Sequence, residues 1–325
     1  MKDSYGRTID YMRISVTDRC NLRCKYCMPE GIRCVPSEEI LTLEEICQVA
    51  ACGGELGIRH IRITGGEPLV RKNCCHLVRQ LKGLPGIEKV TITTNGMLLK
   101  EHLEDLVEGG IDGINISMDT RDRQRFREIT GSDGAEQVLE SIRLAAARPV
   151  AVKVNAVSLD LGEENLVRMA ELAREYPVDV RFIEMMPIGY GKAFPVMDHG
   201  KLLERLGKLY PGLEDDPRVH GSGPAVYYRI PGFKGSIGLI SAIHGKFCDR
   251  CNRVRLTSQG QLKTCLCYED GADLRAILRG EGKAETRRQL LLEAIRQAVE
   301  KKPAAHCFDC PGQITEQRSM VMIGG

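Results

Sequence analysis

The stretch TDRCNLRCKYCM, residues 17–28, carries three cysteines, Cys20, Cys24 and Cys27, at a C-x3-C-x2-C spacing. Thiolates this close on one loop can converge on a single soft metal centre. A four-iron cluster held by three thiolates keeps one iron free, where a small chelating cofactor can bind and accept an electron. Structural zinc normally takes four protein ligands. The spacing therefore predicts a catalytic iron–sulfur cluster, with three cysteines that merely pack as the alternative.

Composition predicts a reduced, globular, cytoplasmic protein. The chain has 325 residues and 14 cysteines, and a chain of this length can bury a large core without disulfides. We identify no secretory signal peptide, and no apolar run reaches the roughly 18 residues that would cross a membrane. A net charge of +2 and an aromatic content of 5% argue against nucleic-acid binding.

Short β-branched runs alternate with helical stretches in the first half of the chain. Strands alternating with amphipathic helices predict βα units around a parallel sheet. About six units predict an α/β fold, an incomplete, open β/α barrel with its chemistry at the carboxyl ends of the strands. Thr42 and Glu45 have the spacing of a helix capping box. The expected strands are 11–16, 60–64, 89–93, 113–117, 150–157 and 179–185, and the expected helices are 42–57, 72–82, 100–107, 135–147 and 163–176.

The alternation stops near Pro187. Residues 225–230 and 236–243, separated by Pro231-Gly232, predict antiparallel strands of a smaller region. A helix is expected over 283–300. We therefore expect a partial barrel over residues 1–186 and a C-terminal region over residues 187–325.

Polar residues follow several of the expected strands. Gly65-Gly66-Glu67-Pro68 follows the second strand, and glycines there let the backbone approach a ligand closely. The later strands end in Thr93-Thr94-Asn95, Ser117-Met118-Asp119, Lys153-Val154-Asn155 and Glu184-Met185-Met186. Any one of these can be an ordinary turn or cap. Their recurrence at the same end of successive strands predicts a shared cavity.

A second cysteine motif lies in the C-terminal region. Cys248, Cys251 and Cys265 have a C-x2-C-x13-C spacing, which is typical of a metal site. Two interpretations stay open: a second cluster with three thiolate ligands, or a zinc site completed by His244, Cys267 or another residue.

Several cations lie where they can meet an anion. If the segment after Cys251 is extended, Arg253 and Arg255 point to the same face. Two guanidiniums beside a metal site form a pocket for a polyanion such as a phosphate chain, and a solvated surface pair is the alternative. Arg13, Arg62 and Lys153 lie on expected strands. A charge inside a parallel sheet is costly unless it is paired, so an anionic substrate is expected.

These motifs together resemble one family over nearly the whole chain. They are the loop Cys20–Cys27, the turn Gly65–Pro68, the run C-x2-C-x-R-x-R-x9-C and the terminal Gly324-Gly325. The chain is similar to the GTP 3',8-cyclases, which are radical S-adenosylmethionine (SAM) enzymes of molybdenum cofactor biosynthesis.

The resemblance implies two four-iron clusters at opposite ends of a partial barrel, each held by three cysteines. Cys20, Cys24 and Cys27 would hold the catalytic cluster that cleaves SAM, and Cys248, Cys251 and Cys265 the cluster whose open iron contacts guanine. The implied SAM-binding residues are Tyr26, Gly66, Ser117 and Met186, and the implied GTP-binding residues are Arg13, Arg62, Thr93, Lys153, Arg253 and Arg255.

The resemblance also implies a reaction and partners. A 5'-deoxyadenosyl radical would abstract the C3' hydrogen of the GTP ribose, and the ribose radical would attack C8 of guanine. The product would be 3',8-cyclo-7,8-dihydroguanosine 5'-triphosphate. The implied partners are an electron donor of the flavodoxin or ferredoxin type and a downstream cyclic pyranopterin synthase, with neither nucleic acid nor membrane. A homodimer is compatible with the resemblance, which leaves the oligomeric state open.

Two alternative functions stay open, namely another radical SAM enzyme with an auxiliary cluster, such as a peptide-modifying one, and a zinc-bound scaffold. The eight cysteines outside the triads also need interpretation. We expect Cys34, Cys47 and Cys52 to be small core residues, and Cys74-Cys75 to lack ligand spacing. Cys267 with Cys307 and Cys310 is a candidate for an additional metal or redox site.

The chain ends in the apolar run Met320–Ile323 followed by Gly324 and Gly325. A frayed end without a role is the usual outcome for such a segment. Residues without side chains can, however, enter a narrow channel where a Cβ would clash. We therefore expect this tail to dock and reach toward the active site, as the resemblance also implies.

Overall fold

A computed structural model describes residues 1–29 and 34–324 of the chain. Twelve strands of these residues form one sheet in the order β12-β11-β10-β1-β2-β3-β4-β5-β6-β9-β8-β7. Their bounds are β1 Tyr11–Ser15, β2 His60–Thr64, β3 Lys89–Thr94, β4 Gly113–Ser117, β5 Ala151–Val157, β6 Asp179–Ile183, β7 Glu214–Asp215, β8 Val226–Arg229, β9 Ile237–Ile240, β10 Arg253–Leu256, β11 Gln261–Lys263 and β12 Gly271–Asp273.

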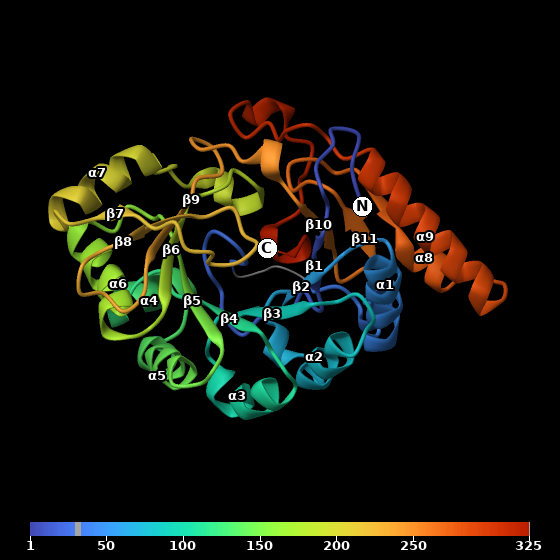
Figure 1. Ribbon diagram of the computed structural model, residues 1–325, viewed down its shortest axis with the longest axis horizontal. Coiled ribbons are helices and arrows are strands. Elements are labelled where there is room, and N and C mark those ends of the chain that lie inside the picture. Colours follow the sequence, from blue (N-terminus) through green and yellow to red (C-terminus); the bar gives the residue numbers. More distant parts are fainter. Residues whose placement is uncertain (30–33, 325) are drawn as a thin grey trace.

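The central strands of this sheet are parallel. Every pairing from β10 through β1 to β6 and on to β9 is parallel, whereas β11 and β12 at one edge and β8 and β7 at the other are antiparallel. The sheet curves around a central space in which the C-terminal end of the chain lies (Figure 1). It forms an open barrel with β12 and β7 as its edges.

The two faces of the sheet differ in polarity because successive strand residues point to opposite faces. Met12 and Ile14 of β1 are fully buried in the hydrophobic core against the helices. Between them, Arg13 is paired in register with Arg62 of β2 and points to the concave face. The outer face is therefore apolar and the inner face polar.

Helices cover the outer face of the barrel (Figure 1). The capping box of the first helix is confirmed, because Thr42 N lies 2.7 Å from Glu45 Oε2 and Glu45 N lies 3.1 Å from Thr42 Oγ1. The helices are α1 Leu43–Glu55, α2 Cys74–Lys82, α3 Leu99–Glu108, α4 Arg123–Thr130, α5 Ala135–Ala146, α6 Glu163–Glu175, α7 His199–Leu209, α8 Leu274–Leu278 and α9 Ala284–Glu300.

The expected α/β barrel is confirmed, with its six strands within two residues of their expected bounds at either end. The expectation for the C-terminal strands needs correction. β8 and β9 are antiparallel, as predicted, but β9 also pairs in parallel with β6, and β10 pairs in parallel with β1. The C-terminal strands therefore extend the barrel sheet at both edges. Helices α4, α7 and α8 were not expected, and α4 buries only Phe126 and Thr130.

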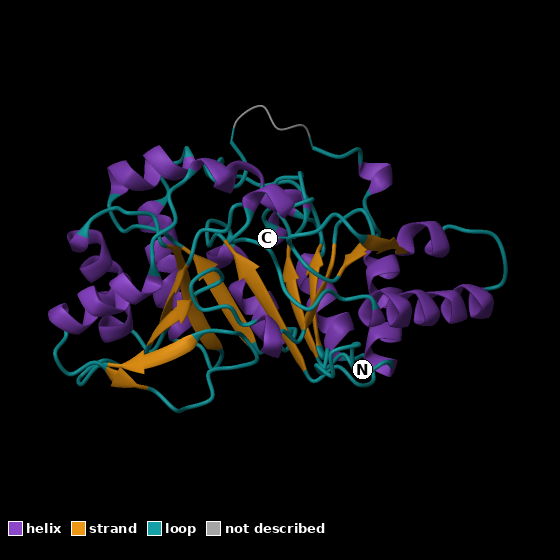
Figure 2. Cartoon of the chain, turned by 90° about the horizontal axis from the view of Figure 1, so that it is seen from above, coloured by secondary structure: helices purple, strands orange, loops and turns teal. Residues whose placement is uncertain are grey.

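The carboxyl ends of the central strands meet at one end of the barrel. In Figure 2 their arrowheads point toward loops among which the C-terminus lies, and the N-terminus lies at the opposite end. The loop after β1 leaves from the carboxyl end. The chain enters β10 from the amino end, because β10 is parallel to β1. In the part of the chain that the structure describes, no helix combines the length and hydropathy needed to cross a membrane.

Candidate active site

The concave face of the sheet lines a cavity of about 320 Å³, near the lower end of the range for small-molecule sites. Successive side chains of a strand point to opposite faces of the sheet. Because the apolar residues of each strand face the helices, the polar residues between them point into this cavity. Arg13, Arg62, Thr93, Ser117 and Arg255 all line this cavity from different strands. The shared cavity predicted from the polar strand ends is thus present.

The first cysteine triad lies at the carboxyl end of the barrel. Cys20, Cys24 and Cys27 are half-buried free thiols on the loop after β1, and all three line the cavity. The backbone N–H of Cys27 donates to the carbonyl of Cys24 at 3.0 Å, which folds the loop into a turn. Burial raises the pKa of each thiol, to about 12 for Cys27. A bound metal must therefore displace a proton from each thiol.

The Gly65-Gly66 turn packs against this loop. A Cβ on Gly66 would lie 2.2 Å from the carbonyl oxygen of Arg19, and a Cβ on Gly65 would lie 2.6 Å from that of Thr17. The N–H groups of Gly66 and Glu67 donate to the same two carbonyls at 2.7 and 2.8 Å. The glycines are thus required by a close approach to the cysteine loop, in addition to any approach to a ligand. Gly66 also lines the cavity.

Glu67 connects this turn to the next strand. Its buried carboxylate accepts hydrogen bonds from Thr94 Oγ1 at 2.8 Å and from the N–H groups of Leu69 and Asn95 at 3.0 and 2.6 Å. Burial raises the pKa of Glu67 to about 7, although these hydrogen bonds oppose the shift. Asn95 Nδ2 lies 3.7 Å from the sulfur of Cys20. Glu67 therefore positions a residue that touches the triad.

A second carboxylate lies beside the first triad. The Tyr26 hydroxyl donates to Asp119 Oδ2 at 2.7 Å, and the Val157 N–H donates to Asp119 Oδ1 at 2.8 Å. Burial raises the pKa of Asp119 to about 6. Tyr26, Ser117 and Met186 line the cavity together with Gly66, so the structure brings all four expected SAM contacts to one place.

The second triad lines the same cavity from the opposite end. Cys248 lies in a short 3-10 turn, Cys251 lies two residues before β10, and Cys265 lies two residues after β11. Since β10 is parallel to β1 and β11 is antiparallel to β10, these three positions meet at the amino end of the barrel. The Cys251 N–H donates to the Cys248 carbonyl at 3.2 Å.

Cations surround the second triad. Lys302, which is 3% exposed, donates from Nζ to the carbonyls of Arg253, at 3.2 Å, and Thr264. Burial alone would raise the pKa of the Cys251 thiol, but Lys302 and Arg253 outweigh it, and the pKa is lowered. At Cys265 burial still raises the pKa, with Lys302 opposing it, so these cations act most strongly on Cys251.

Four arginines lie between the triads. Arg13 is in register with Arg62 on one side and with Arg255 on the other. Burial, with the neighbouring Arg13 guanidinium, lowers the pKa of Arg62 to about 9, and burial, Arg13 and Arg253 lower that of Arg255. The buried Nε atoms of Arg13 and Arg253 have no hydrogen-bond partner among the described residues. Such a cluster is satisfied by an anion.

Among the described residues, Lys153 does not line the cavity as the four arginines do, whereas Arg181 does. Lys153 Nζ lies 2.6 Å from Asp179 Oδ2 and 3.1 Å from the Tyr227 hydroxyl, and Lys153 is not among the described residues that line the cavity. Arg181 does line the cavity, and its guanidinium donates to Asn155 Oδ1 at 2.6 Å. Sequence reasoning missed Arg181, although it lies on an expected strand like Arg13.

The sulfurs of each triad lie farther apart than a single tetrahedral zinc ion would hold them. Tetrahedral zinc with bonds of about 2.3 Å holds its sulfurs about 3.8 Å apart. Within residues 1–29 and 34–324, neither triad has its three sulfurs within 4.8 Å of one another. His244, a proposed fourth zinc ligand, instead pairs through Nδ1 with Glu184.

The C-terminal tail reaches the cavity. Arg255 Nη1 donates to the Gly324 carbonyl at 2.6 Å, and Gly324 has φ 76°, a conformation that favours glycine. The Val321 N–H donates to the Cys27 sulfur, which opposes the rise in pKa that burial causes. The expected docking of the tail is thus present up to Gly324, and Gly325 lies outside the described residues.

The remaining cysteines divide into three groups. The Cys267 and Cys307 sulfurs lie 2.9 Å apart in a small buried cluster, but Cys310 is exposed, and no three ligands converge there among the described residues. Cys34 is exposed, so its expected core role is wrong. The cysteines that belong to the main core or pack against it are Cys47, Cys52, Cys74 and Cys75.

Comparisons with known proteins identify two family regions and full-length relatives. Residues 14–179 match the radical SAM superfamily, and residues 178–308 match the family described as Molybdenum Cofactor Synthesis C. A protein named GTP 3',8-cyclase from Clostridium perfringens is 41% identical over 327 residues, which cover 100% of both chains. One of the same name from Moorella thermoacetica is 42% identical over 330 residues, again covering 100% of both.

Solved structures share the fold. The crystal structure of Streptococcus suis SuiB bound to S-adenosylmethionine has a TM-score of 0.67 to this chain, at 14% identity. The match covers 97% of this chain and 77% of SuiB. The expected α/β fold is therefore found in a solved structure with SAM bound.

Proposed function

The chain belongs to the GTP 3',8-cyclase family of radical SAM enzymes, and from this premise we propose the reaction and the role of each site residue. The proposed reaction converts GTP to 3',8-cyclo-7,8-dihydroguanosine 5'-triphosphate, as the first step of molybdenum cofactor biosynthesis. The C-terminal family match supports the pathway.

One observation carries the proposal: a group of guanidiniums, one buried and three half-buried, lies between two thiol triads in one cavity. Arg13, Arg62, Arg253 and Arg255 would bind the triphosphate, and the unpartnered Nε atoms of Arg13 and Arg253 support this role. A charge-assisted hydrogen bond stabilises a complex by about 1.5–3 kcal/mol. Several such bonds together can offset the cost of burying the guanidiniums. Thr93 would contribute a hydroxyl from the same face.

The carboxyl end suits SAM. The sulfonium of SAM is a cation, and Asp119 places a carboxylate beside the first triad through its hydrogen bond to Tyr26. Tyr26, Gly66, Ser117 and Met186 would hold the cofactor there. Cys20, Cys24 and Cys27 would bind the iron–sulfur cluster.

The amino end suits the nucleotide. Cys248, Cys251 and Cys265 would bind a second four-iron cluster whose open iron faces the guanine. Lys302 and Arg253 support this assignment, because they offset the negative charge of thiolates and phosphates. We therefore propose two clusters because the cavity has two triads of three thiols each, one beside a carboxylate and the other beside cations.

When bound, the first cluster and SAM supply the radical chemistry that removes the C3' hydrogen of the ribose. The residues of the chain position the reactants and exclude water. The arginines on β1, β2 and β10 would hold the triphosphate, and the second triad would fix the base. The docked tail would close the carboxyl end, with Gly324 held by Arg255. Together, these residues would hold the ribose C3' hydrogen next to SAM.

We also propose a division of the chain and its partners. Residues 1–186 would supply the SAM half and residues 187–325 the second cluster and the tail. Two family matches that meet at residues 178–179, a little before this boundary, support a division into two parts. The proposed partners are a flavodoxin- or ferredoxin-type reductant and a downstream cyclic pyranopterin synthase. Lys153 is kept as a weaker contributor to GTP binding, because its charge is paired with Asp179.

The test is an anaerobic incubation of the reconstituted protein with reductant, SAM and GTP carrying deuterium at C3'. We expect 5'-deoxyadenosine that contains the deuterium, together with the cyclised nucleotide, both measured by mass spectrometry. ATP in place of GTP is the control and should give neither. The proposal would be contradicted if the 5'-deoxyadenosine contained no deuterium and no cyclised nucleotide formed.

A further inference from the structure

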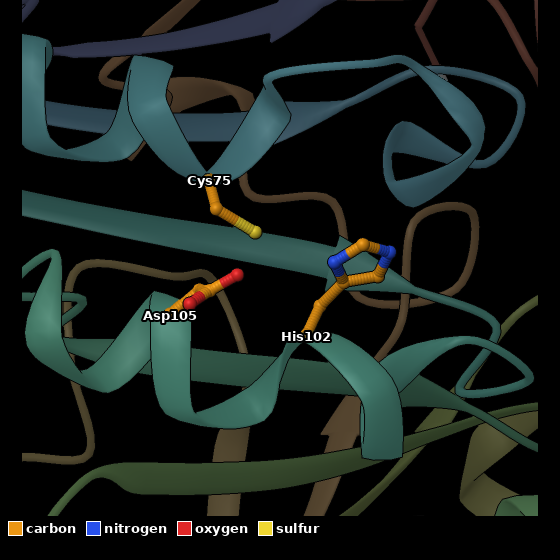
Figure 3. Close-up of side chains that lie close together, drawn as sticks. All are labelled: Cys75, His102 and Asp105. Carbon is orange, nitrogen blue, oxygen red and sulfur yellow. The ribbon is translucent and has the colours of Figure 1, made fainter.

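Outside the active site, three potential metal ligands converge between α2 and α3. Cys75 comes from α2, and His102 and Asp105 come from α3. One ligand atom of each lies within 4.8 Å of the others. Figure 3 shows the three side chains directed toward the same space between the helices. Among residues 1–29 and 34–324, no other three cysteine, histidine or acidic side chains have ligand atoms within 4.8 Å of one another.

The fold explains how these residues meet. His102 and Asp105 are three apart on α3, so they share one face of that helix. The neighbours Cys74 and Cys75 diverge, since Cys74 is 3% exposed in the core and Cys75 is half-buried toward α3. Sequence reasoning found no ligand spacing for Cys75 because its partners come from another helix.

We propose that Cys75, His102 and Asp105 bind one Zn²⁺ ion, with water in the fourth position. Thiolate, imidazole and carboxylate are the ligand types that zinc takes in proteins, and the thiolate disfavours magnesium and calcium. Zinc bonds of about 2.0–2.3 Å set tetrahedral ligand atoms about 3.3–3.8 Å apart, so the three side chains, two half-buried and one exposed, would move closer together when the ion binds.

The three side chains are available for a metal. Within the described part of the chain, no other residue forms a hydrogen bond or ion pair with the Cys75 thiol, the His102 ring or the Asp105 carboxylate. Burial and then the Asp105 carboxylate raise the pKa of the Cys75 thiol to about 11. Zinc therefore replaces a proton on this sulfur and offsets the repulsion between thiolate and carboxylate.

The site is separate from the proposed chemistry. Helices α2 and α3 lie outside the sheet (Figure 1), and none of the three residues is among the described residues that line the cavity. Bound zinc would link two neighbouring helices and stabilise the folded state, because the unfolded chain does not hold the ligands together.

The experiment uses the holoenzyme with its iron–sulfur clusters intact, equilibrated anaerobically with Zn²⁺ alone and then desalted. We expect about one zinc per chain. X-ray absorption at the zinc edge should show one sulfur at about 2.3 Å and nitrogen or oxygen at about 2.0–2.2 Å. Iron does not contribute to this signal, so the clusters do not mask it.

Matched variants locate the ion. Cys75→Ser and His102→Asn should each lose the bound zinc and keep their iron content. Cys47→Ser, another half-buried helical cysteine, and His76→Asn, an exposed histidine beside Cys75, should retain it. Zinc retained by Cys75→Ser, a sulfur count of three at the zinc edge, or no zinc after desalting would each overturn the proposal. A count of three would place zinc in an iron–sulfur triad instead.

Discussion

The two cysteine triads offer the same three thiols to a metal but lie in opposite electrostatic surroundings. At the carboxyl end, burial and then the Asp119 carboxylate raise the pKa of Cys24 well above its usual value. At the amino end, burial would also raise the pKa of Cys251, but Lys302 and Arg253 outweigh it and the pKa is lowered. Burial raises the pKa of Cys265 as well. The contrast between the two ends is therefore clearest in the groups beside them, which are Asp119 at one end and Lys302 with Arg253 at the other.

This difference indicates what each end binds. A carboxylate-lined end favours a sulfonium cation, and a cation-lined end favours a nucleotide triphosphate, because burying an unpaired charge is costly. The arginines of β1, β2 and β10 lie between the two ends on the same face. The comparison therefore predicts that damage to one triad affects one ligand first.

The largest effect is expected for Cys24→Ala. Loss of one of three thiolates should remove the first cluster, so both SAM cleavage and nucleotide cyclisation should disappear. 5'-Deoxyadenosine and the cyclised product are measured in anaerobic turnover. Cys47→Ala, which removes a thiol from α1, is the control and should retain both. Substantial SAM cleavage by Cys24→Ala would contradict the assignment of the first triad.

Cys251→Ala should separate the two activities. Because the first triad is intact, some SAM cleavage should persist, whereas cyclised nucleotide should be absent since the base is no longer anchored. The measurement is the ratio of 5'-deoxyadenosine to cyclised product. A normal rate of product formation would show that the second triad has no role in the reaction.

Deleting Gly324 and Gly325 should remove cyclisation without loss of iron. Gly324 is held by Arg255 at the carboxyl end, so its removal should open the site but leave both triads in place. Product formation, iron content and melting temperature are measured together. A synthetic peptide of the last residues should partly restore activity. Unchanged turnover would mean that the tail is dispensable.

Arg255→Ala should raise the dissociation constant for GTP at least tenfold, since a charge-assisted contact contributes about 1.5–3 kcal/mol. Binding of SAM should barely change. Because Arg255 also holds Gly324, combining this change with the tail deletion should cost less than the sum of the two. Equal weakening of both ligands would indicate a structural role for Arg255.

The smallest effect is expected for Lys153→Met. Its ammonium is already paired with Asp179 at 2.6 Å, so GTP binding should weaken less than in Arg255→Ala. Isothermal titration of both variants under the same conditions makes the comparison. A larger loss for Lys153→Met would show that this lysine leaves its ion pair to reach the nucleotide.

Local sequence features predicted most of the barrel. The β-branched runs with polar ends marked β1 to β6, and Thr42 with Glu45 marked the start of α1, because these signals lie within a few residues. The pairing of β10 with β1 was not predictable, because it joins residues about 240 positions apart, such as Arg13 and Arg255.

The same limit explains what could not be predicted at the site. The ion pair of Lys153 with Asp179 was not foreseen because it depends on strand register. Cys75 was set aside because its neighbours lie on another helix. By contrast, the two triads were found because each has at least two cysteines within a few residues. Arg181 could have been found by the rule that identified Arg13 and Arg62.

The most direct test of the comparison is equilibrium binding of SAM and of GTP to the two cysteine variants. Cys24→Ala should lose SAM binding and keep GTP binding near that of the unaltered protein. Cys251→Ala should weaken GTP binding, because the base is no longer held while the arginines still hold the triphosphate, and it should keep SAM binding. If both variants lose both ligands to the same extent, the two ends of the cavity do not divide the ligands between them.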